Sequence, residues 1–368
     1  MDAADPHGAT RTADRTTDRT ADRTTDRTTD RAAPRAEALL VMDAATYALQ
    51  FGAEQLQRLG GLVRLGDPVW VDELDSPAAR DRLARTDVLI TSWGAPGLTV
   101  ERLDAAPRLR AVLHCAGSVR GLVGDEVWRR GIAVSSAAEE NAVPVAEYTL
   151  AAIIMAGKKA PFLAARARHE RDGWAAGLVR RDLSNRGRTI GVVGFSRIGR
   201  RVVELLRILD TAAVLVSDPY ADPAEVAAAG GVLVPLDDVL RRSDILSLHA
   251  PALAETRHMI GGRELALLPD GATVVNTARG SLVDHDALLR ECGSGRLHAI
   301  LDVTEPEPLP ATSPLLDLPN VMITPHIAGS LGAETRRMSD HAIDELENVL
   351  QGRALSTPVT PDAFTVSA

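Results

Sequence analysis

The sequence predicts an α/β protein of two domains, each built on an open parallel sheet, and three observations lead to this prediction. With 368 residues, the chain is long enough for about two domains that each bury a core. From residue 37 onward, short apolar segments alternate with segments of helical periodicity, as in parallel sheets. Around residues 191–199, an apolar run enters a glycine-rich turn and then a helical pattern, which is typical of the first unit of a doubly wound sheet.

The chain before this alternation is a low-complexity tail. A four-residue repeat, Arg-Thr-Ala/Thr-Asp, runs from Arg11 to about Arg31 and contains no apolar residue larger than alanine. Such a segment buries too little surface to offset the entropy that ordering costs. We therefore predict that residues 1–36 form a disordered tail.

Residues 37–141 are expected to form the first part of a small domain with an open sheet. Its five predicted strands are residues 38–42, 61–64, 88–92, 109–115 and 132–135. A long helical pattern then runs from about Asn141 to Arg168. A helix of this length can carry the chain to a second domain.

A second sheet is expected within a domain that spans residues 142–329. Its predicted strands are residues 189–193, 214–217, 245–249, 273–276, 299–302 and 321–324. Polar residues at or just after the strand ends should meet at the carboxyl edge of the sheet, where ligands of such folds bind. These residues are Asp218, His249, Asn276, Asp302 and His326.

An amphipathic helix at about residues 333–350 has room to return to the first sheet. Residues 37–141 and 330–368 would then form one domain, which the domain of residues 142–329 interrupts. The predicted fold class is α/β, with a Rossmann-type domain inserted in a flavodoxin-like domain.

The turn at residues 194–199 has the features of a dinucleotide-binding site. Gly194 and Gly199 match two glycines of the G-x-G-x-x-G pattern, and Ser196 replaces the middle one. A serine adds only a small side chain there, and its hydroxyl is able to bind a phosphate oxygen. The backbone amides of Arg197 and Ile198 would face the pyrophosphate at the start of the helix.

Asp218 ends the next predicted strand about 20 residues further on, where an acid binds the adenosine ribose in such folds. Pro219 and Tyr220 follow it, and no arginine stands there to receive a 2′-phosphate. We therefore expect NAD rather than NADP as the cofactor.

The composition argues against several other classes of protein. The formal net charge is −9, and no basic cluster is interleaved with aromatic residues, so a nucleic-acid partner is not expected. No apolar run reaches the roughly 18 residues that a membrane span needs, and no apolar signal core begins the chain. Cys115 and Cys292 are isolated, so neither a disulfide nor a metal site is predicted. We expect a cytoplasmic protein.

The motifs together resemble the D-isomer-specific 2-hydroxyacid dehydrogenases, and the resemblance covers nearly all of the chain beyond the tail. The matching segments occur in the order of the family: residues 191–199, 218–219, 248–251 with Thr256, 267–272, 275–284, 301–309 and 324–329. The resemblance implies an NAD-dependent enzyme that transfers a hydride between the cofactor and a D-2-hydroxy acid or its 2-keto acid.

The resemblance also implies a catalytic trio. His326 is similar to the proton donor of the family, and imidazole has the unperturbed pKa nearest to neutral pH. Glu307 is similar to the carboxylate that holds this ring and favours its charged form. Glu305 stands two residues earlier, but the family spacing of five residues after Asp302 selects Glu307. Arg279 is similar to the clamp that binds the substrate carboxylate through two parallel hydrogen bonds.

Further residues match segments of the family that contact the cofactor. By resemblance, Asp302 accepts a hydrogen bond from the nicotinamide carboxamide. The other matched cofactor positions are Pro219, His249, Ala250, Pro251, Thr256, Thr277, Ala278, Arg279, His326 and Gly329.

Ala116, Gly117 and Ser118 occupy the place of the family's substrate loop, in which backbone amides hold the carboxylate. Many relatives carry a second glycine and an Asp soon after, whereas this chain has Ser118, Val119 and Arg120. Arg120 is either a recognition group for a second anion on the substrate or a solvated surface residue. Family analogy also suggests a homodimer, formed mainly through the cofactor domain and the region of residues 142–168.

Other functions share this scaffold. Formate dehydrogenation is disfavoured, because that branch typically carries Gln where this chain has Glu307. Phosphite oxidation keeps a similar trio and stays open, as does a non-enzymatic role as an NAD-sensing corepressor. Turnover of any keto acid would separate these functions, and the candidate substrates range from glyoxylate and hydroxypyruvate to bulkier aliphatic and aryl keto acids.

Overall fold

The structure is a computed structural model, and it describes residues 35–167 and 183–366. The predicted disordered tail therefore lies outside the described residues, except for its last two positions. There the chain is already paired, because the carbonyl of Ala36 accepts a hydrogen bond from the Arg64 amide at 2.9 Å. In the described residues, no helix has the length and apolar character that crossing a membrane requires.

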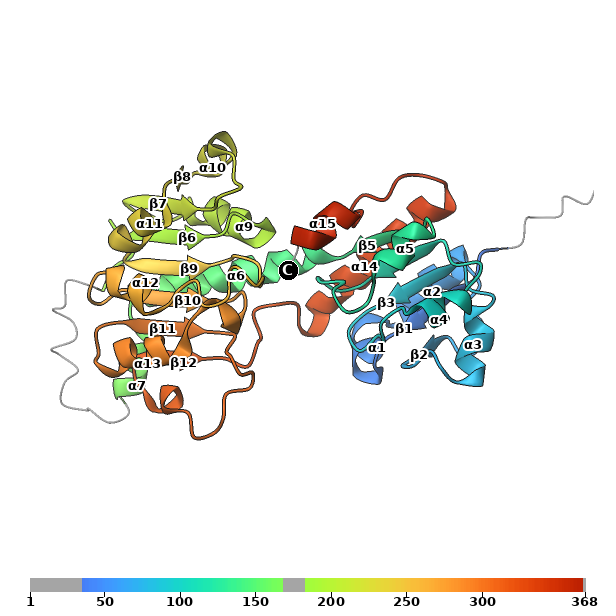
Figure 1. Cartoon of the computed structure of the whole chain (residues 1–368), viewed down its shortest axis with the longest axis horizontal. Helices are drawn as coiled ribbons and strands as arrows, with labels where there is room; N and C mark the ends of the chain where they lie inside the picture. The colour runs from blue at the N-terminus through green and yellow to red at the C-terminus, as the bar shows by residue number, and fades with distance from the viewer. Residues whose placement is uncertain (1–34, 168–182, 367–368) are drawn as a thin grey trace, which may run out of the picture. The chain divides into compact units, whose positions relative to one another are not determined.

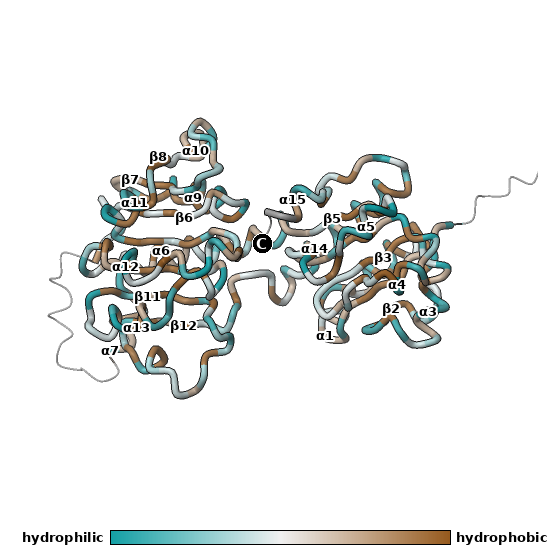
Figure 2. Tube along the Cα trace, viewed as in Figure 1, coloured by the Kyte–Doolittle hydropathy of each residue, from teal (hydrophilic) through white to brown (hydrophobic). Residues whose placement is uncertain are grey.

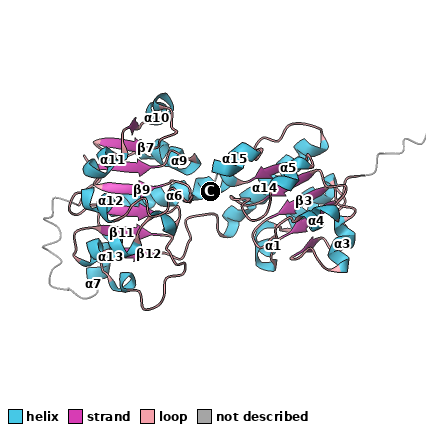
Figure 3. Ribbon diagram, viewed as in Figure 1, coloured by secondary structure: helices cyan, strands magenta, loops and turns pink. Residues whose placement is uncertain are grey.

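The first sheet is entirely parallel and has the strand order β2-β1-β3-β4-β5 (Figures 1 and 3). This is the order of a flavodoxin-like sheet, as the sequence predicted. The strands are β1 (Ala38–Val41), β2 (Trp70–Val71), β3 (Val88–Thr91), β4 (Ala111–His114) and β5 (Ala133–Ser136).

Helices cover both faces of the first sheet, because successive side chains of its strands point to opposite faces and are mostly apolar and buried. Leu40 and Ile90 pack in a core with helices from one face, whereas Leu39 and Leu89 pack in a core with helices from the other. The first face is covered by α1 (Ala44–Gln50), α2 (Ala53–Leu62) and the late helix α14 (Thr335–Leu350). The other face carries α3 (Pro77–Leu83), α4 (Val100–Asp104) and α5 (Asp125–Arg129).

The second sheet is also parallel, with the order β12-β11-β10-β9-β6-β7-β8 (Figure 1). Its strands are β6 (Thr189–Val193), β7 (Ala213–Ser217), β8 (Val232–Leu233), β9 (Ile245–Leu248), β10 (Thr273–Asn276), β11 (His298–Leu301) and β12 (Val321–Ile323). The order reverses at β6, which lies between β7 and β9. This is the doubly wound order of dinucleotide-binding domains, and ligands bind at such a reversal.

Two layers of helices enclose the second sheet. One layer consists of α6 (Ala138–Gly157), α7 (Ala160–Ala167), α9 (Arg197–Leu206) and α10 (Pro223–Ala229). The other consists of α11 (Leu236–Arg242), α12 (Gly262–Leu267) and α13 (His285–Gly293). The remaining described helices are η1 (Gly280–Leu282), η2 (Pro314–Asp317), η3 (Gly332–Glu334) and α15 (Pro361–Val366). Figure 2 shows the hydrophobic residues concentrated along the strands of both sheets, as burial on two faces requires.

Two sequence-based predictions of elements were wrong. Residues 61–64 are not a strand: α2 continues to Leu62, and the edge strand is Trp70–Val71 instead. A short apolar run cannot be assigned to a helix or strand by periodicity alone, and Leu59 and Val63 face the core from the end of the helix. The long helix predicted to reach Arg168 is broken at Lys159, which has a φ of 53°, and Arg168 itself lies outside the described residues.

The chain after α14 is fixed to the first sheet by a buried carboxylate. Glu345 of α14 is fully buried, and its oxygens accept five hydrogen bonds, from Asn348 and from both the backbone amides and the hydroxyls of Ser356 and Thr357. Burial alone would raise the pKa of Glu345, but these hydrogen bonds outweigh it and lower the pKa to about 2. The following residue Pro358 then bridges to β5.

We predict that Glu345→Gln destabilises the protein in a pH-dependent manner. Because the folded-state pKa of Glu345 is depressed to about 2, its contribution is fully present above the unfolded-state pKa near 4.3 and is lost as the pH falls toward 2. The melting temperature of the variant should therefore lie below that of the wild type at pH 7, and the difference should shrink below about pH 4. Thermal unfolding from pH 3 to pH 8 measures this, and a difference that is constant with pH would contradict it.

Candidate active site

The glycine turn lies at the carboxyl end of β6, at the point where the strand order reverses. Gly194 has a φ of 93°, which a residue with a side chain rarely adopts. A Cβ atom on Gly194 would come within 2.5 Å of the Ala250 amide nitrogen, and one on Gly199 would lie 2.0 Å from the carbonyl oxygen of Gly194. Both glycines are therefore required by close backbone approach, one against the loop after β9 and one between α9 and the turn.

Ser196 caps α9. Its hydroxyl accepts a hydrogen bond from the Gly199 amide at 3.3 Å, which satisfies one of the unpaired N–H groups at the helix start. The side chain that replaces the family's middle glycine is thus used locally as a cap. The hydroxyl keeps its own hydrogen, so Ser196 can still donate to an anion at the start of α9.

Asp218 follows β7 and is hydrogen-bonded across the turn. One carboxylate oxygen accepts from the Phe195 amide at 2.7 Å, and the other accepts from the Tyr220 amide at 2.8 Å. The acid is therefore fixed beside the glycine turn. Each oxygen has a further lone pair, so this position remains suited to a ribose hydroxyl.

The loop after β9 presents a buried histidine to the same region. His249 is 3% exposed, its Nε2 lies 2.9 Å from the Ser247 hydroxyl, and burial lowers its pKa to about 3, which keeps the ring neutral. Thr256 closes this loop by donating from its hydroxyl to the Pro251 carbonyl and accepting from the Leu253 amide. Ala250, in the same loop, contacts the glycine turn as described above.

The turn after β10 is held by Asn276. Its side-chain oxygen accepts from the Ala278 amide at 3.1 Å, and its side-chain nitrogen donates to the Arg279 carbonyl at 2.8 Å. Thr277 is tied to Thr149 of α6 through their hydroxyls at 2.8 Å. Arg279 is solvent-exposed, and it places one guanidinium nitrogen on the Ala278 carbonyl at 2.6 Å. Because a guanidinium has five N–H groups, others stay available for a carboxylate.

Arg279 is exposed as a whole residue, but its guanidinium loses part of its hydration to the surrounding groups. Desolvation lowers the pKa of Arg279, and the negative charge of Glu307 raises it in turn. Arginine starts from a pKa above 12, so the side chain keeps its positive charge. The loops after β10 and β11 therefore place a cation and a carboxylate within electrostatic reach of each other.

His326 and Glu307 are directly paired. The Nδ1 atom of His326 lies 2.6 Å from a carboxylate oxygen of Glu307, and both side chains are about half exposed. His326 has a φ of 55°, an uncommon backbone conformation that its surroundings must hold in place. Glu305, the competing acid in the sequence, instead pairs with Arg257 and His258. The structure therefore pairs Glu307 with His326 and Glu305 with a different loop.

Asp302 supports the loop that carries His326. Its carboxylate is 1% exposed, and it accepts hydrogen bonds from the Thr324 hydroxyl at 2.6 Å and from the amides of Ile327 and Ala328 at 2.8 Å. The backbone carbonyl of Asp302 accepts from the His326 amide as well. Asp302, which the resemblance assigns to the nicotinamide, therefore also holds the loop of His326 in place.

The substrate loop follows β4. Ala116 is buried and its carbonyl accepts from the Ala137 amide at 3.1 Å, just before α6. Gly117 lies beside Asn141, whose side-chain oxygen accepts from the Ser330 amide at 3.0 Å. Asn141 at the start of α6 thus lies between the Gly117 region and the chain that follows Gly329.

Arg120 is engaged by the C-terminal helix. Its guanidinium donates to the Phe364 carbonyl at 3.2 Å, and it lies 5.6 Å from the centre of the Phe364 ring. The same ring packs on Trp128 of α5, with centroids 5.1 Å apart. Neither of the two interpretations of Arg120 from the sequence included this contact, because α15 itself was not predicted.

Sequence reasoning missed four supporting residues of the site. Tyr148 and Asn141 gave no signal, since a tyrosine or asparagine near the start of a long helix is usually packing or capping. Tyr148 proves to contact the Thr324 hydroxyl at 2.7 Å. Asn276 was noted only as polar, and Gly280 only as part of a matched segment. A glycine directly after Arg279 was the signal for a close backbone approach.

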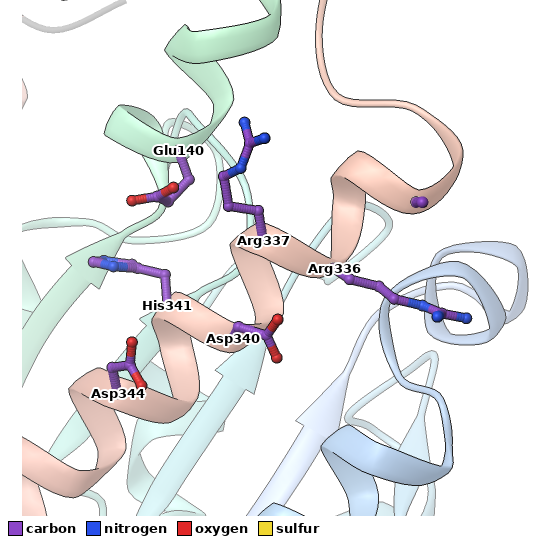
Figure 4. A pocket seen from close by; sticks show the side chains of 7 residues that line it. Glu140, Arg336, Arg337, Asp340, His341 and Asp344 are labelled. Atoms are coloured by element: carbon purple, nitrogen blue, oxygen red, sulfur yellow. The ribbon is translucent and has the colours of Figure 1, made fainter.

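A separate hollow of about 410 Å³ lies along α14 (Figure 4). Side chains of both charges line it, and they belong to Glu140, Ala333, Arg336, Arg337, Asp340, His341 and Asp344. None of the predicted site residues is among them. The described residues also hold no group of His, Cys, Asp and Glu suited to a metal ion. Both cysteines are buried free thiols, and burial raises the pKa of Cys292 to about 12.

The residues at the reversal of the second sheet fit a dinucleotide. The glycines make room that a Cβ would fill, α9 offers its N-terminal amides, and Asp218 stands at the end of the next strand. Fold and site together define an α/β dinucleotide-binding protein with a histidine–carboxylate pair beside an arginine.

Comparison with known proteins identifies the family. Residues 150–328 match the NAD binding domain of the D-isomer specific 2-hydroxyacid dehydrogenases. The glyoxylate reductase of Aeropyrum pernix is 34% identical over 261 residues, which cover 68% of this chain and 76% of that protein. The chain belongs to the D-isomer specific 2-hydroxyacid dehydrogenase family, and its second sheet is the NAD-binding domain.

One further relative and one solved structure extend the comparison, the relative by its sequence and the structure by its fold alone. The D-3-phosphoglycerate dehydrogenase of Mycobacterium tuberculosis is 36% identical over 310 residues, which cover 82% of this chain. The chain spans only 56% of the length of that relative. A phosphoglycerate oxidoreductase from Rhizobium etli has the same fold, with a TM-score of 0.73 at 24% identity, covering 88% of this chain and 98% of that one. The α/β fold class and the two-domain architecture predicted from the sequence are thereby confirmed.

Proposed function

We propose that this protein is an NAD-dependent D-2-hydroxyacid dehydrogenase that interconverts a 2-keto acid and its D-2-hydroxy acid. The observation that carries the proposal is the contact of 2.6 Å between His326 Nδ1 and Glu307. This contact fixes one ring nitrogen of His326 at the carboxyl edge of the second sheet, where the dinucleotide site lies. Arg279 follows β10 on the same edge, and β10 is paired with β11, which precedes the loop of Glu307.

His326 is the proton donor and acceptor in this proposal. Because Glu307 occupies Nδ1, the proton that moves to the substrate is held on Nε2. A bound NADH would supply the hydride to carbon 2 of the keto acid in reduction, and NAD would take it back in oxidation. His326 gives its proton to the carbonyl oxygen, which becomes the hydroxyl group. In oxidation, His326 accepts that proton from the hydroxyl.

Arg279 and the substrate loop hold the carboxylate of the substrate. A guanidinium binds a carboxylate through two parallel hydrogen bonds, which also fixes the orientation of the neighbouring carbonyl. The backbone amides around Ala116, Gly117 and Ser118 would share the carboxylate, as in the family. Asn276 supports this arrangement, because both ends of its side-chain amide hold the turn that carries Arg279.

The contacts of Arg120 favour a substrate without a second anion. D-3-phosphoglycerate, named for one relative, would require a cation for its phosphate, and Arg120 is the cation nearest in sequence to the substrate loop. Its guanidinium instead contacts the carbonyl and ring of Phe364. We therefore propose simple 2-keto acids, with glyoxylate, the substrate named for another relative, among the smallest.

The experiment that tests the proposal is NADH consumption across 2-keto acids from glyoxylate to phenylpyruvate, with 3-phosphohydroxypyruvate and NADPH run in parallel. Turnover of simple keto acids with NADH supports it. Silence across the panel, with NADH still bound, would reject the reductase and favour phosphite oxidation or an NAD-sensing role.

We predict that Arg279→Ala weakens use of the keto acid more than it lowers maximal turnover. Loss of a charge-assisted pair costs about 1.5–3 kcal/mol, which corresponds to roughly 10- to 100-fold in KM. The Kd for NADH should stay close to that of the wild type. Steady-state kinetics checks this prediction, and an unchanged KM for the keto acid would remove Arg279 from the role of carboxylate clamp.

A further inference from the structure

Glu305, the acid that the proposed mechanism does not use, makes two specific contacts. One carboxylate oxygen lies 2.5 Å from a guanidinium nitrogen of Arg257, and the other lies 3.1 Å from His258 Nε2. The hydrogen bond from Arg257 is the main cause that lowers the pKa of Glu305. Glu305 is therefore a fixed negative charge with both oxygens paired to a neighbouring loop.

That neighbouring loop is itself held against the segment that follows Arg279. The His258 amide donates to the Ser281 carbonyl at 2.8 Å, and the Ile260 amide donates to the Leu282 carbonyl at 3.0 Å. His258 has a φ of 52°, which only a well-determined surrounding maintains in a residue other than glycine. Arg257 and His258 thus lie in a loop that backbone hydrogen bonds hold against residues 281–282.

The segment around Glu305 connects the loop of Arg257 and His258 to the pair of His326 and Glu307. The Thr304 hydroxyl donates to the Pro306 carbonyl at 2.9 Å, so the chain turns tightly just before Glu307. On the upstream side, Asp302 holds the loop of His326. Between Asp302 and Glu307, the side chain of Glu305 connects the chain to the loop that carries Arg257 and His258.

We propose that Glu305 is a positioning residue, which through Arg257 and His258 holds Glu307 in contact with His326. The inference rests on the proposed function, in which Glu307 orients the catalytic ring. Glu307 and His326 are both about half exposed, so solvent would compete for either side chain if the backbone could shift. Fixing the backbone two residues before Glu307 limits that shift.

The exposure of the contacts distinguishes positioning from a role in stability. The side chain of Arg257 is 55% exposed and that of Glu305 is 32% exposed. Ion pairs of this kind contribute little to the free energy of folding. Removing Glu305 should therefore leave the fold intact, while a small displacement of a catalytic group can lower turnover roughly 100-fold.

The test is a double-mutant cycle on kcat with the best keto acid, using Glu305→Ala, Glu307→Ala and the double variant. We expect Glu305→Ala to lower kcat by roughly 10- to 100-fold, with an unchanged Kd for NADH and an unchanged melting temperature. In the Glu307→Ala background, the same change should have almost no further effect, because Glu305 acts through Glu307. Glu305→Gln keeps an acceptor for Arg257 and should retain most of the turnover.

Asp237→Ala is the matched control, since it removes a surface pair of similar exposure, with Arg263 at 2.7 Å. Its turnover should equal that of the wild type. Wild-type turnover in Glu305→Ala, or a loss that is equally large in both backgrounds, would overturn the inference while leaving the role of Glu307 intact. If Glu307→Ala by itself leaves kcat unchanged, the role proposed for Glu307 and the inference that rests on it are both wrong, whereas silence of the wild type across all keto acids rejects the proposed function.

Discussion

His326→Ala is expected to lower turnover of keto acid by roughly 10²–10⁴-fold, the range that a positioned general acid contributes. The variant has no group that can give a proton to the carbonyl oxygen as the hydride arrives. NADH binding should be almost unchanged, because the glycine turn, α9 and Asp218 do not depend on the ring of His326. Steady-state turnover and NADH fluorescence titration measure the two effects.

Two controls make the result specific. His341→Ala removes a histidine that contacts Thr357 at 2.8 Å and that has no part in the proposed reaction, so its turnover should match the wild type. Glu307→Ala should lie between His326→Ala and the wild type, since the ring remains but its Nδ1 partner is lost. Wild-type turnover in His326→Ala would show that another group supplies the proton.

Gly280→Ala is expected to cause the second large loss, although Gly280 contacts no substrate in the proposed mechanism. A Cβ atom at this position would lie 2.0 Å from the carbonyl carbon of Thr304 and 2.6 Å from the Glu305 amide nitrogen. These are backbone atoms, so the methyl group must push the Arg279 turn away from the segment that leads to Glu307. Overpacking of this kind costs about 1–3 kcal/mol of stability.

The displacement in Gly280→Ala should lower kcat/KM by about 100-fold or more, because Arg279 and Glu307 would no longer keep their relative positions. Gly293→Ala is the matched control in the same domain: it ends α13, and a Cβ there meets no atom within 4 Å. Alanine at that position should be neutral or stabilise by about 0.5–1 kcal/mol. Kinetics and thermal unfolding of both variants decide the matter, and a fully active, stable Gly280→Ala protein would contradict the close packing.

Most of the secondary structure could be predicted from the sequence, because strands buried on both faces read as short apolar runs. β6 and β10 have the predicted bounds, β7, β9 and β12 differ by one residue at one end, and β11 begins and ends one residue earlier than predicted. β8 and β2 have two residues each, which is too short for a pattern. The strand predicted at residues 61–64 failed because the apolar end of a helix looks the same as a strand over four residues.

The candidate site residues could be proposed from motifs, whereas their supporting contacts could not. Ser196 was interpreted as a tolerated replacement of the middle glycine, and the structure shows that it caps α9. From the sequence, Arg120 was either a recognition group for a second anion or a solvated surface residue. The structure instead shows a contact with Phe364. Asn141 joins segments that are 189 residues apart in the chain, a relation that no local pattern encodes.

The sequence alone predicted the doubly wound fold and the place of the dinucleotide turn, because these depend on local periodicity and on residue types at fixed spacing. The choice of His326, Glu307 and Arg279 came from the resemblance to the family and stays a prediction. The tertiary structure decided which side chains meet. Only the packing of the loops after β9, β10 and β11 assigned Glu305 to Arg257 and His258, and placed Gly280 against Thr304. Hydrogen bonds and close contacts form between segments distant in the chain, so their partners depend on the folded arrangement of the whole sheet.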